Sequence, residues 1–301
     1  MPESQLLALG FPEAGKTTFL AALWHVTESE EIPESLCLER LSGDAQYLNR
    51  IKNDWLLCQK VKPTIPGHEE YPSLWLRDKV KGLIGEVSFP DLAGEFFMKA
   101  WVKRRWSLKY DSLVTSANGL LLFVNPIKVR EPSTIADVEA IGETALQEER
   151  SAESGPNASA EAPASAVVRW DPEKAATQVQ LVELLQFVDI RMPAKRPVRV
   201  AVIISAWDLV ATKKTADITP ARWLERRLSL VDQFLKSNFE RFEVRVFGVS
   251  AQGGELPDDY ARLKKCKHAS ERIRIEGVDC AKHDISEPVR WGLGFRSVAR
   301  S

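Results

Sequence analysis

Apolar and polar positions along the chain fall into blocks whose periods predict strands and helices in turn. Apolar runs at 5–9, 119–124, 198–204 and 244–249 predict buried strands, and helical spacing of apolar residues occurs in 16–24, 44–58, 178–188 and 223–239. Strands that alternate with helices favour a mainly parallel sheet covered by helices on both faces. We therefore expect an α/β fold of three layers, closed by a mixed, partly helical segment at 270–293.

Two further segments refine this expectation. Residues 73–77 and 86–89 have the pattern of strands and are joined by a turn at 82–85, which predicts a β-hairpin. Residues 151–166 contain no apolar side chain larger than alanine, so they cannot bury enough surface to offset the entropy lost on ordering. We expect a single domain over 1–301, with an insertion at 127–169 that includes a disordered loop at 151–166.

Charge and composition exclude several classes of protein. The 41 Lys and Arg residues balance 42 Asp and Glu residues to a net charge of -1, so no overall positive charge attracts nucleic acid or an anionic membrane. No apolar run approaches the roughly 18 residues that a membrane span needs. The 4 cysteines form no CxxC pair and have no histidine at metal-ligand spacing, which indicates reduced thiols. We expect a cytoplasmic protein that binds neither membrane nor nucleic acid.

The first chemical motif is the sequence GFPEAGKT at 10–17, which has the G-x-x-x-x-G-K-[ST] pattern of a phosphate-binding loop. It follows an apolar strand and opens an apolar-faced helix, which is the setting that this motif requires. Backbone N–H groups would surround the phosphate oxygens, Lys16 would reach the β and γ phosphates, and the Thr17 hydroxyl would ligate Mg²⁺. The predicted nucleotide-binding residues of this segment are Gly10, Pro12, Glu13, Ala14, Gly15, Lys16, Thr17 and Thr18.

A second motif, DLAGE at 91–95, follows the predicted hairpin. Its DxxG pattern places Asp91 where a carboxylate would bind Mg²⁺ through water, and Gly94 where a backbone N–H would meet the γ-phosphate. A phosphate-binding loop alone leaves kinases, ATPases and GTPases open. The hairpin before DxxG favours a GTPase.

With these two motifs the chain resembles the TRAFAC class of P-loop GTPases, and within it the bacterial double-GTPase families of GTPase-associated conflict systems. The features of the closer resemblance are Trp24, the segment KPTIP at 62–66, Trp207-Asp208 and the segment EPVRW at 287–291. The resemblance implies a P-loop NTPase fold, GTP or GDP and Mg²⁺ as ligands, and a GTP-hydrolysing switch that regulates a bacterial multi-protein system.

The same resemblance implies roles for residues outside the two motifs. Thr64 matches the threonine of a mobile loop that caps Mg²⁺ and the γ-phosphate. The place of the guanine-reading [NT]KxD motif is taken by residues 205–208, of which Ser205, Trp207 and Asp208 are predicted to contact the nucleotide. Asp208 would accept hydrogen bonds from guanine, and Trp207 would shield the base. Ser250 and Ala251 match a short element that closes over it.

The hydrolytic residue and the partner surface complete the predicted site. Glu95 stands where many small GTPases have glutamine, and its carboxylate either holds the attacking water or repels the γ-phosphate. With Pro12 in the loop, this predicts slow turnover, with Lys16, Gly94 and Glu95 as catalytic residues. The basic and tryptophan-containing segment 99–109 contacts a protein partner or is a solvated helix face. A nucleotide-binding pseudo-GTPase and an ATP-using P-loop enzyme stay open as alternatives.

Overall fold

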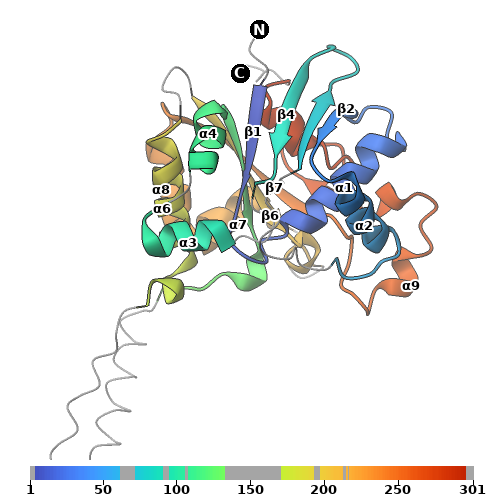
Figure 1. Cartoon of the computed structure of the whole chain (residues 1–301). Helices are drawn as coiled ribbons and strands as arrows, with labels where there is room; N and C mark the ends of the chain where they lie inside the picture. Colours follow the sequence, from blue (N-terminus) through green and yellow to red (C-terminus); the bar gives the residue numbers. More distant parts are fainter. Residues whose placement is uncertain are drawn as a thin grey trace, which may run out of the picture.

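An eight-stranded sheet runs through the computed structural model of the chain (Figure 1), which describes residues 4–61, 72–90, 95–105, 108–132, 171–192, 197–212, 215 and 217–295. In spatial order the strands are β2 (Cys37–Ser42), β3 (Ser73–Arg77), β4 (Ile84–Ser88), β1 (Ser4–Leu9), β5 (Gly119–Val124), β6 (Val198–Ser205), β7 (Phe242–Ser250) and β8 (Arg274–Glu276). The five central strands, which are β4, β1, β5, β6 and β7, pair in parallel. The pairs β2–β3, β3–β4 and β7–β8 are antiparallel. The α/β fold with a mainly parallel sheet is therefore confirmed.

Helices cover both faces of this sheet, so the predicted three layers are also confirmed (Figure 1). One face packs against α1 (Lys16–Ser29), α2 (Ala45–Leu56) and α10 (Glu287–Gly292). The other packs against α3 (Glu95–Lys103), α4 (Leu108–Ser116), α6 (Thr177–Asp189), α7 (Pro220–Arg227) and α8 (Ser229–Ser237). The short α9 (Tyr260–Leu263) lies below the sheet in Figure 1. None of the helices in the described ranges is long and apolar enough to cross a membrane.

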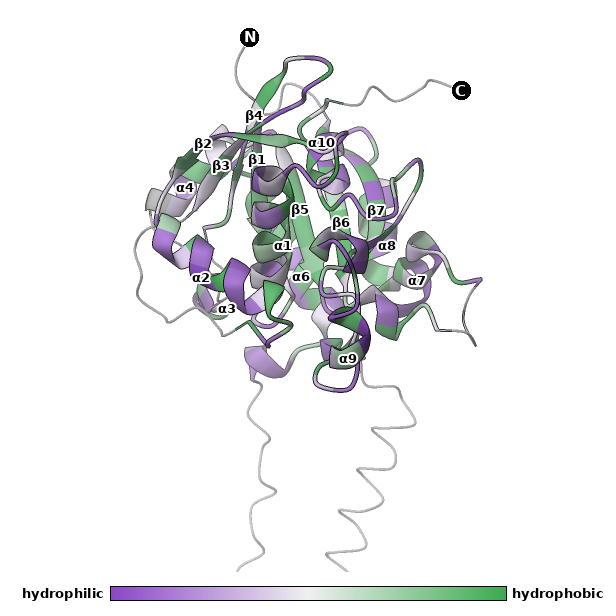
Figure 2. Cartoon of the chain, turned by 90° about the vertical axis from the view of Figure 1, so that its right-hand side faces the viewer, coloured by the Kyte–Doolittle hydropathy of each residue, from purple (hydrophilic) through white to green (hydrophobic). Residues whose placement is uncertain are grey.

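The period of two in the strands explains why there are two cores. Leu6 and Ala8 of β1 belong to the core under α1, whereas Leu7 and Leu9 belong to the core under α6. Successive side chains of a strand point to opposite faces, so a central strand must be apolar at every position to line both cores. Figure 2 shows the resulting hydrophobic band along the central strands.

The hairpin predicted before the DxxG motif is present as β3 and β4, and it packs against the C-terminal helix α10. Arg290 of α10 pairs through Nη1 with Asp78 Oδ2, at the end of β3, at 3.0 Å, and both side chains are buried. On β4, a Cβ at Gly85 would lie 2.7 Å from Leu293 Cδ2, so any larger residue would force the Leu293 side chain to shift. The hairpin and α10 therefore form one packed unit.

The prediction of one continuous helix over 223–239 is wrong, because the structure has two helices there, α7 and α8. Leu228 has φ -135° and ψ 52°, which ends α7 and begins α8. Its side chain is fully buried, so tertiary packing holds a backbone angle that the apolar spacing does not reveal. The edge strands β2 and β8 were not predicted, because β2 is largely polar and β8 has only 3 residues.

The predicted disordered loop at 151–166 lies outside the described residues, but the chain on either side of 133–170 is joined. The backbone N–H of Arg130 donates to Thr177 Oγ1 at 2.9 Å, and the Thr177 N–H donates to the Arg130 carbonyl at 3.0 Å. Arg130 Nη1 also donates to the Glu173 carbonyl at 2.5 Å. The two ends of this insertion therefore meet without help from 151–166.

We predict that replacing 151–166 by a short Gly/Ser linker leaves the melting temperature and the nucleotide affinity almost unchanged. The cost of closing a flexible loop changes only slowly with its length, and the contacts of Arg130 keep its ends together. Thermal unfolding and calorimetric titration of the two proteins test this. A large decrease in either quantity would mean that the segment packs against the domain.

Candidate functional site

Four segments that follow parallel strands meet at one edge of the sheet. They are the loop after β1, Asn125 after β5, the segment 205–208 at the end of β6 and the segment 250–253 at the end of β7. In open α/β sheets, ligands bind in the crevice outside the carboxyl ends of the strands. The fold therefore brings the predicted phosphate-binding and base-binding residues together.

The loop between β1 and α1 packs directly against β6. Gly15 has φ 94°, and a Cβ there would lie 2.7 Å from Ser205 Cβ, so a side chain fits neither the conformation nor the space. Gly15 is also the N-cap of α1 and provides no side-chain cap. The N–H groups of the first helical turn are therefore free of a capping side chain, and such groups attract anions.

Lys16 lies inside this loop rather than on the surface. Its side chain is 2% exposed, and Nζ donates to the carbonyls of Gly10 at 2.5 Å and Phe11 at 3.1 Å. Its neighbours Thr17 and Thr18 are half-buried on the first turn of α1. An ammonium held within a ring of backbone groups is suited to phosphate oxygens. Of the other predicted loop residues, Pro12 and Glu13 are exposed and Ala14 is buried.

Asn125 is a residue of this edge that the sequence analysis missed. Its Nδ2 donates to the Glu13 carbonyl at 2.9 Å, and Lys128, one turn further on, pairs with the Glu13 carboxylate at 2.5 Å. The hydrogen bond and the charge of Lys128 lower the pKa of Glu13. Glu13 itself has φ 60°. A polar residue directly after the buried run 119–124 was the signal that could have found it.

Trp207 and Asp208, which follow β6, lie in different surroundings. Trp207 is 3% exposed, packs against Gly248 and donates through Nε1 to Glu276 Oε2 at 2.7 Å. Its ring therefore packs in the core, and the predicted contact of Trp207 with a base stays a prediction. Asp208 is partly exposed at the same edge. Ser205 donates through Oγ to the Val124 carbonyl at 3.2 Å.

The segment after β7 is held as a tight loop beside Asp208. Ser250 Oγ accepts the Gly253 N–H at 3.1 Å, and Arg262 of α9 donates through Nη2 to the Gly253 carbonyl at 2.8 Å. Arg262 also donates to Asp259 Oδ1 at 2.9 Å. This hydrogen bond raises the pKa of Arg262, and the charge of Asp208 acts in the same direction. A fixed cation thus lies near the carboxylate that is predicted to read the base.

Residues 7–292 match the protein family described as Double-GTPase 1. The chain belongs to this family. The match covers both motifs and confirms the resemblance drawn from them. No curated protein matches the chain.

Two solved structures are similar to this Double-GTPase 1 member at low identity. Bacterial selenocysteine-specific elongation factor EF-Sec is similar at 14% identity and a TM-score of 0.38, over 88% of this chain and 28% of that chain. The T. maritima FeoB G domain is similar at 12% identity and a TM-score of 0.31, over 87% of this chain and 99% of that chain. The Double-GTPase 1 chain thus spans less than a third of the elongation factor.

Several predicted site residues of the Double-GTPase 1 chain lie outside the described residues, namely Thr64, Asp91 and Gly94. Glu95 is described and is the first residue of α3. Its carboxylate is partly exposed and pairs with Lys99, one turn further on, at 3.1 Å. A carboxylate in the first turn of a helix is also stabilised by the helix dipole.

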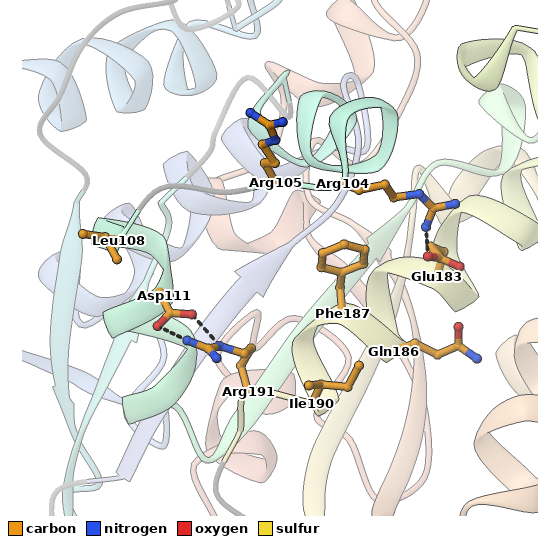
Figure 3. Close-up of a pocket in the computed structure, with 9 residues that line it drawn as sticks. All are labelled: Arg104, Arg105, Leu108, Asp111, Glu183, Gln186, Phe187, Ile190 and Arg191. Atoms are coloured by element: carbon orange, nitrogen blue, oxygen red, sulfur yellow. Dashed lines mark hydrogen bonds and ion pairs between the residues drawn. The ribbon is translucent and has the colours of Figure 1, made fainter.

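The described part of the basic segment 99–109 forms one wall of a surface groove of about 430 Å³ (Figure 3). Arg104 pairs with Glu183 of α6, and Asp111 of α4 accepts two hydrogen bonds from Arg191 at 2.7 and 2.5 Å. The groove is also lined by Leu108, which is 88% exposed, and by Ile190, which is 81% exposed. Trp106 lies outside the described residues. The described part of the segment therefore borders a groove with apolar and charged lining residues, and its contact with a protein partner stays a prediction.

Proposed function

We propose that this Double-GTPase 1 chain binds GTP and GDP with Mg²⁺ and hydrolyses GTP slowly. The observation that carries the proposal is the single edge at which the Gly10 to Thr17 loop, Asp208 and the loop 250–253 meet. A triphosphate on the loop would have its base toward β6 and β7. The regulatory role in a bacterial conflict system is proposed from the family resemblance alone.

The residues of the two motifs have defined tasks in this proposal. The N–H groups of the first turn of α1 and Lys16 would bind the β and γ phosphates. The Thr17 hydroxyl is a hard oxygen ligand and would bind Mg²⁺, with Asp91 and Thr64 as the further proposed ligands. Bound Mg²⁺ would neutralise charge on the phosphates. Because phosphoryl transfer needs little covalent chemistry from the protein, these groups and an ordered water suffice.

Calorimetric titration with GTP, GDP and ATP, each with and without Mg²⁺, tests this proposal. We expect guanine nucleotides to bind more tightly than ATP, and Mg²⁺ to strengthen GTP binding. Tighter binding of ATP would favour an ATP-using P-loop enzyme. Binding of GTP without turnover would favour a pseudo-GTPase.

Glu95→Ala is predicted to lower the rate constant of GTP hydrolysis by about tenfold, with nucleotide affinity little changed. The reason is that a carboxylate holding the attacking water acts chiefly in the transition state. Single-turnover hydrolysis at saturating Mg²⁺ measures the effect. Lys99→Ala is the matched control, since it removes the other half of the Glu95 ion pair. A parental rate in Glu95→Ala would assign the carboxylate to the helix surface and leave the water to another group.

We also propose that a protein partner contacts the predicted switch regions and the groove between α4 and α6, and that nucleotide state controls the contact. The groove supports this because one wall continues from α3, which begins directly after the DxxG motif. Amide hydrogen exchange with GDP and with a non-hydrolysable GTP analogue tests the link. We expect protection in 95–105 and 183–191 to differ between the two states, and equal protection would contradict it.

A further inference from the structure

Trp55 joins α2 to the loop after β7, although the two are far apart in the sequence. Trp55 lies in the last turn of α2 and is fully buried. Its indole Nε1 donates to the Ala251 carbonyl at 2.9 Å. Ala251 belongs to the loop 250–253, which the proposed function assigns to the base. The helix α2, which follows the antiparallel edge strand β2, therefore contacts the candidate nucleotide site through Trp55.

Arg272 supports this contact from the other side. Its side chain is 4% exposed, and the guanidinium carbon lies 4.4 Å from the centre of the Trp55 ring. Nη1 also donates to the Cys58 thiol at 2.6 Å. The Arg272 carbonyl oxygen would be only 2.1 Å from a Cβ at Gly253, which has φ 84°. One residue thus touches both the end of α2 and the loop 250–253.

The hydrogen bond from Trp55 fixes a peptide unit of the loop. The Ala251 carbonyl and the Gln252 N–H belong to the same planar group and point in opposite directions. Binding the carbonyl to Trp55 therefore holds the Gln252 N–H directed away from α2. A loop that recognises a base through backbone groups needs them to be in place before the ligand arrives, because ordering them on binding lowers the affinity.

We propose that Trp55 and Arg272 are positioning residues that set the affinity of the loop 250–253 for the nucleotide base. This inference rests on the proposed function. It makes α2 part of the nucleotide site, although no residue of α2 needs to touch the ligand. If the proposal holds, a change at Trp55 or Arg272 weakens the binding of ligands that have a base and leaves the binding of ligands without a base unchanged.

Trp55→Phe tests the proposal, because it retains an aromatic ring and removes the N–H donor. We expect GDP and GTP to bind about three- to tenfold more weakly, with faster dissociation, which corresponds to one buried hydrogen bond. Pyrophosphate should bind as it does to the parent protein. The matched control is Trp24→Phe, since Trp24 is also buried but donates to Asn49 of α2 at 3.2 Å. The control should keep its GDP affinity.

Arg272→Lys is the second variant, in case Trp55→Phe does not fold. It retains the charge but loses the planar group against Trp55, and we expect a similar, base-dependent loss. Unchanged GDP affinity in either folded variant would overturn the inference, as would an equal loss for pyrophosphate or in Trp24→Phe. If the parent protein binds no guanine nucleotide, the proposed function fails first, so the two failures are distinguishable.

Discussion

Lys16→Ala is expected to weaken binding of GTP and GDP by about a hundredfold or more and to abolish measurable hydrolysis. The ammonium is buried within the loop, so little water screens its interaction with a phosphate oxygen. Charge-assisted hydrogen bonds of this kind are about twice as strong as neutral ones. During phosphoryl transfer the same cation would face the oxygens on which charge is spread, so the rate should fall further than the affinity.

Calorimetric titration and single-turnover hydrolysis measure this effect, and Lys52→Ala is the matched control. Lys52 pairs with Glu28 on the outside of α1 and α2 at 2.6 Å, so its removal changes the net charge equally but leaves the loop alone. The melting temperature of both variants should also be measured, because Lys16 binds the Gly10 and Phe11 carbonyls and its removal can destabilise the loop. Parental affinity and turnover in folded Lys16→Ala would refute the assignment of the phosphate-binding loop.

Asp208→Asn is expected to lower the affinity for GTP by about a hundredfold and to raise the affinity for xanthosine triphosphate. A site built to accept hydrogen bonds from the guanine edge rejects a ligand strongly once its buried polar groups are left unpaired. The amide of asparagine has an NH₂ group that can donate to the additional carbonyl of xanthine. The preference between the two bases should therefore reverse.

Asp217→Asn is the control for this exchange, since Asp217 is an exposed carboxylate beyond the same strand. Competition between GTP and xanthosine triphosphate for one labelled nucleotide gives the ratio directly. An equal loss for both bases would indicate that Asp208 holds Arg262 and the loop around Gly253, rather than the base. No loss for either base would place base recognition elsewhere.

Local patterns in the sequence were sufficient for the central sheet and for the position of the first motif. Leu6 to Leu9 are all apolar because both faces of β1 are covered, and a short run of this kind is visible without any structure. The loop after it must approach β6 closely at Gly15, and the glycine at that position is part of the motif. In these places the local sequence and the tertiary contacts require the same residue.

The remaining contacts depend on pairs that no periodicity reveals. Trp55 and Ala251 come from distant parts of the chain, and neither residue type at its position predicts the other. The space beside Gly248 accommodates the Trp207 ring in the core, and the place of Trp207 in the segment 205–208 does not reveal this contact. Such outcomes are decided by which cavities the packed helices and strands leave, and that information is not local.

The packing of the β3 and β4 hairpin against α10 limits the movements that a ligand could cause in this molecule. Sliding the hairpin along β1 by one pleat repeat would move Asp78 roughly 7 Å from Arg290. It would break the buried ion pair between Asp78 and Arg290, and Asp78 would lose its cation, whereas Arg290 would keep Asp284 at 3.5 Å. Loss of a γ-phosphate is thus not expected to shift the register of the sheet. The hairpin is therefore a fixed part of the fold, and we expect any movement that follows nucleotide binding to occur outside it.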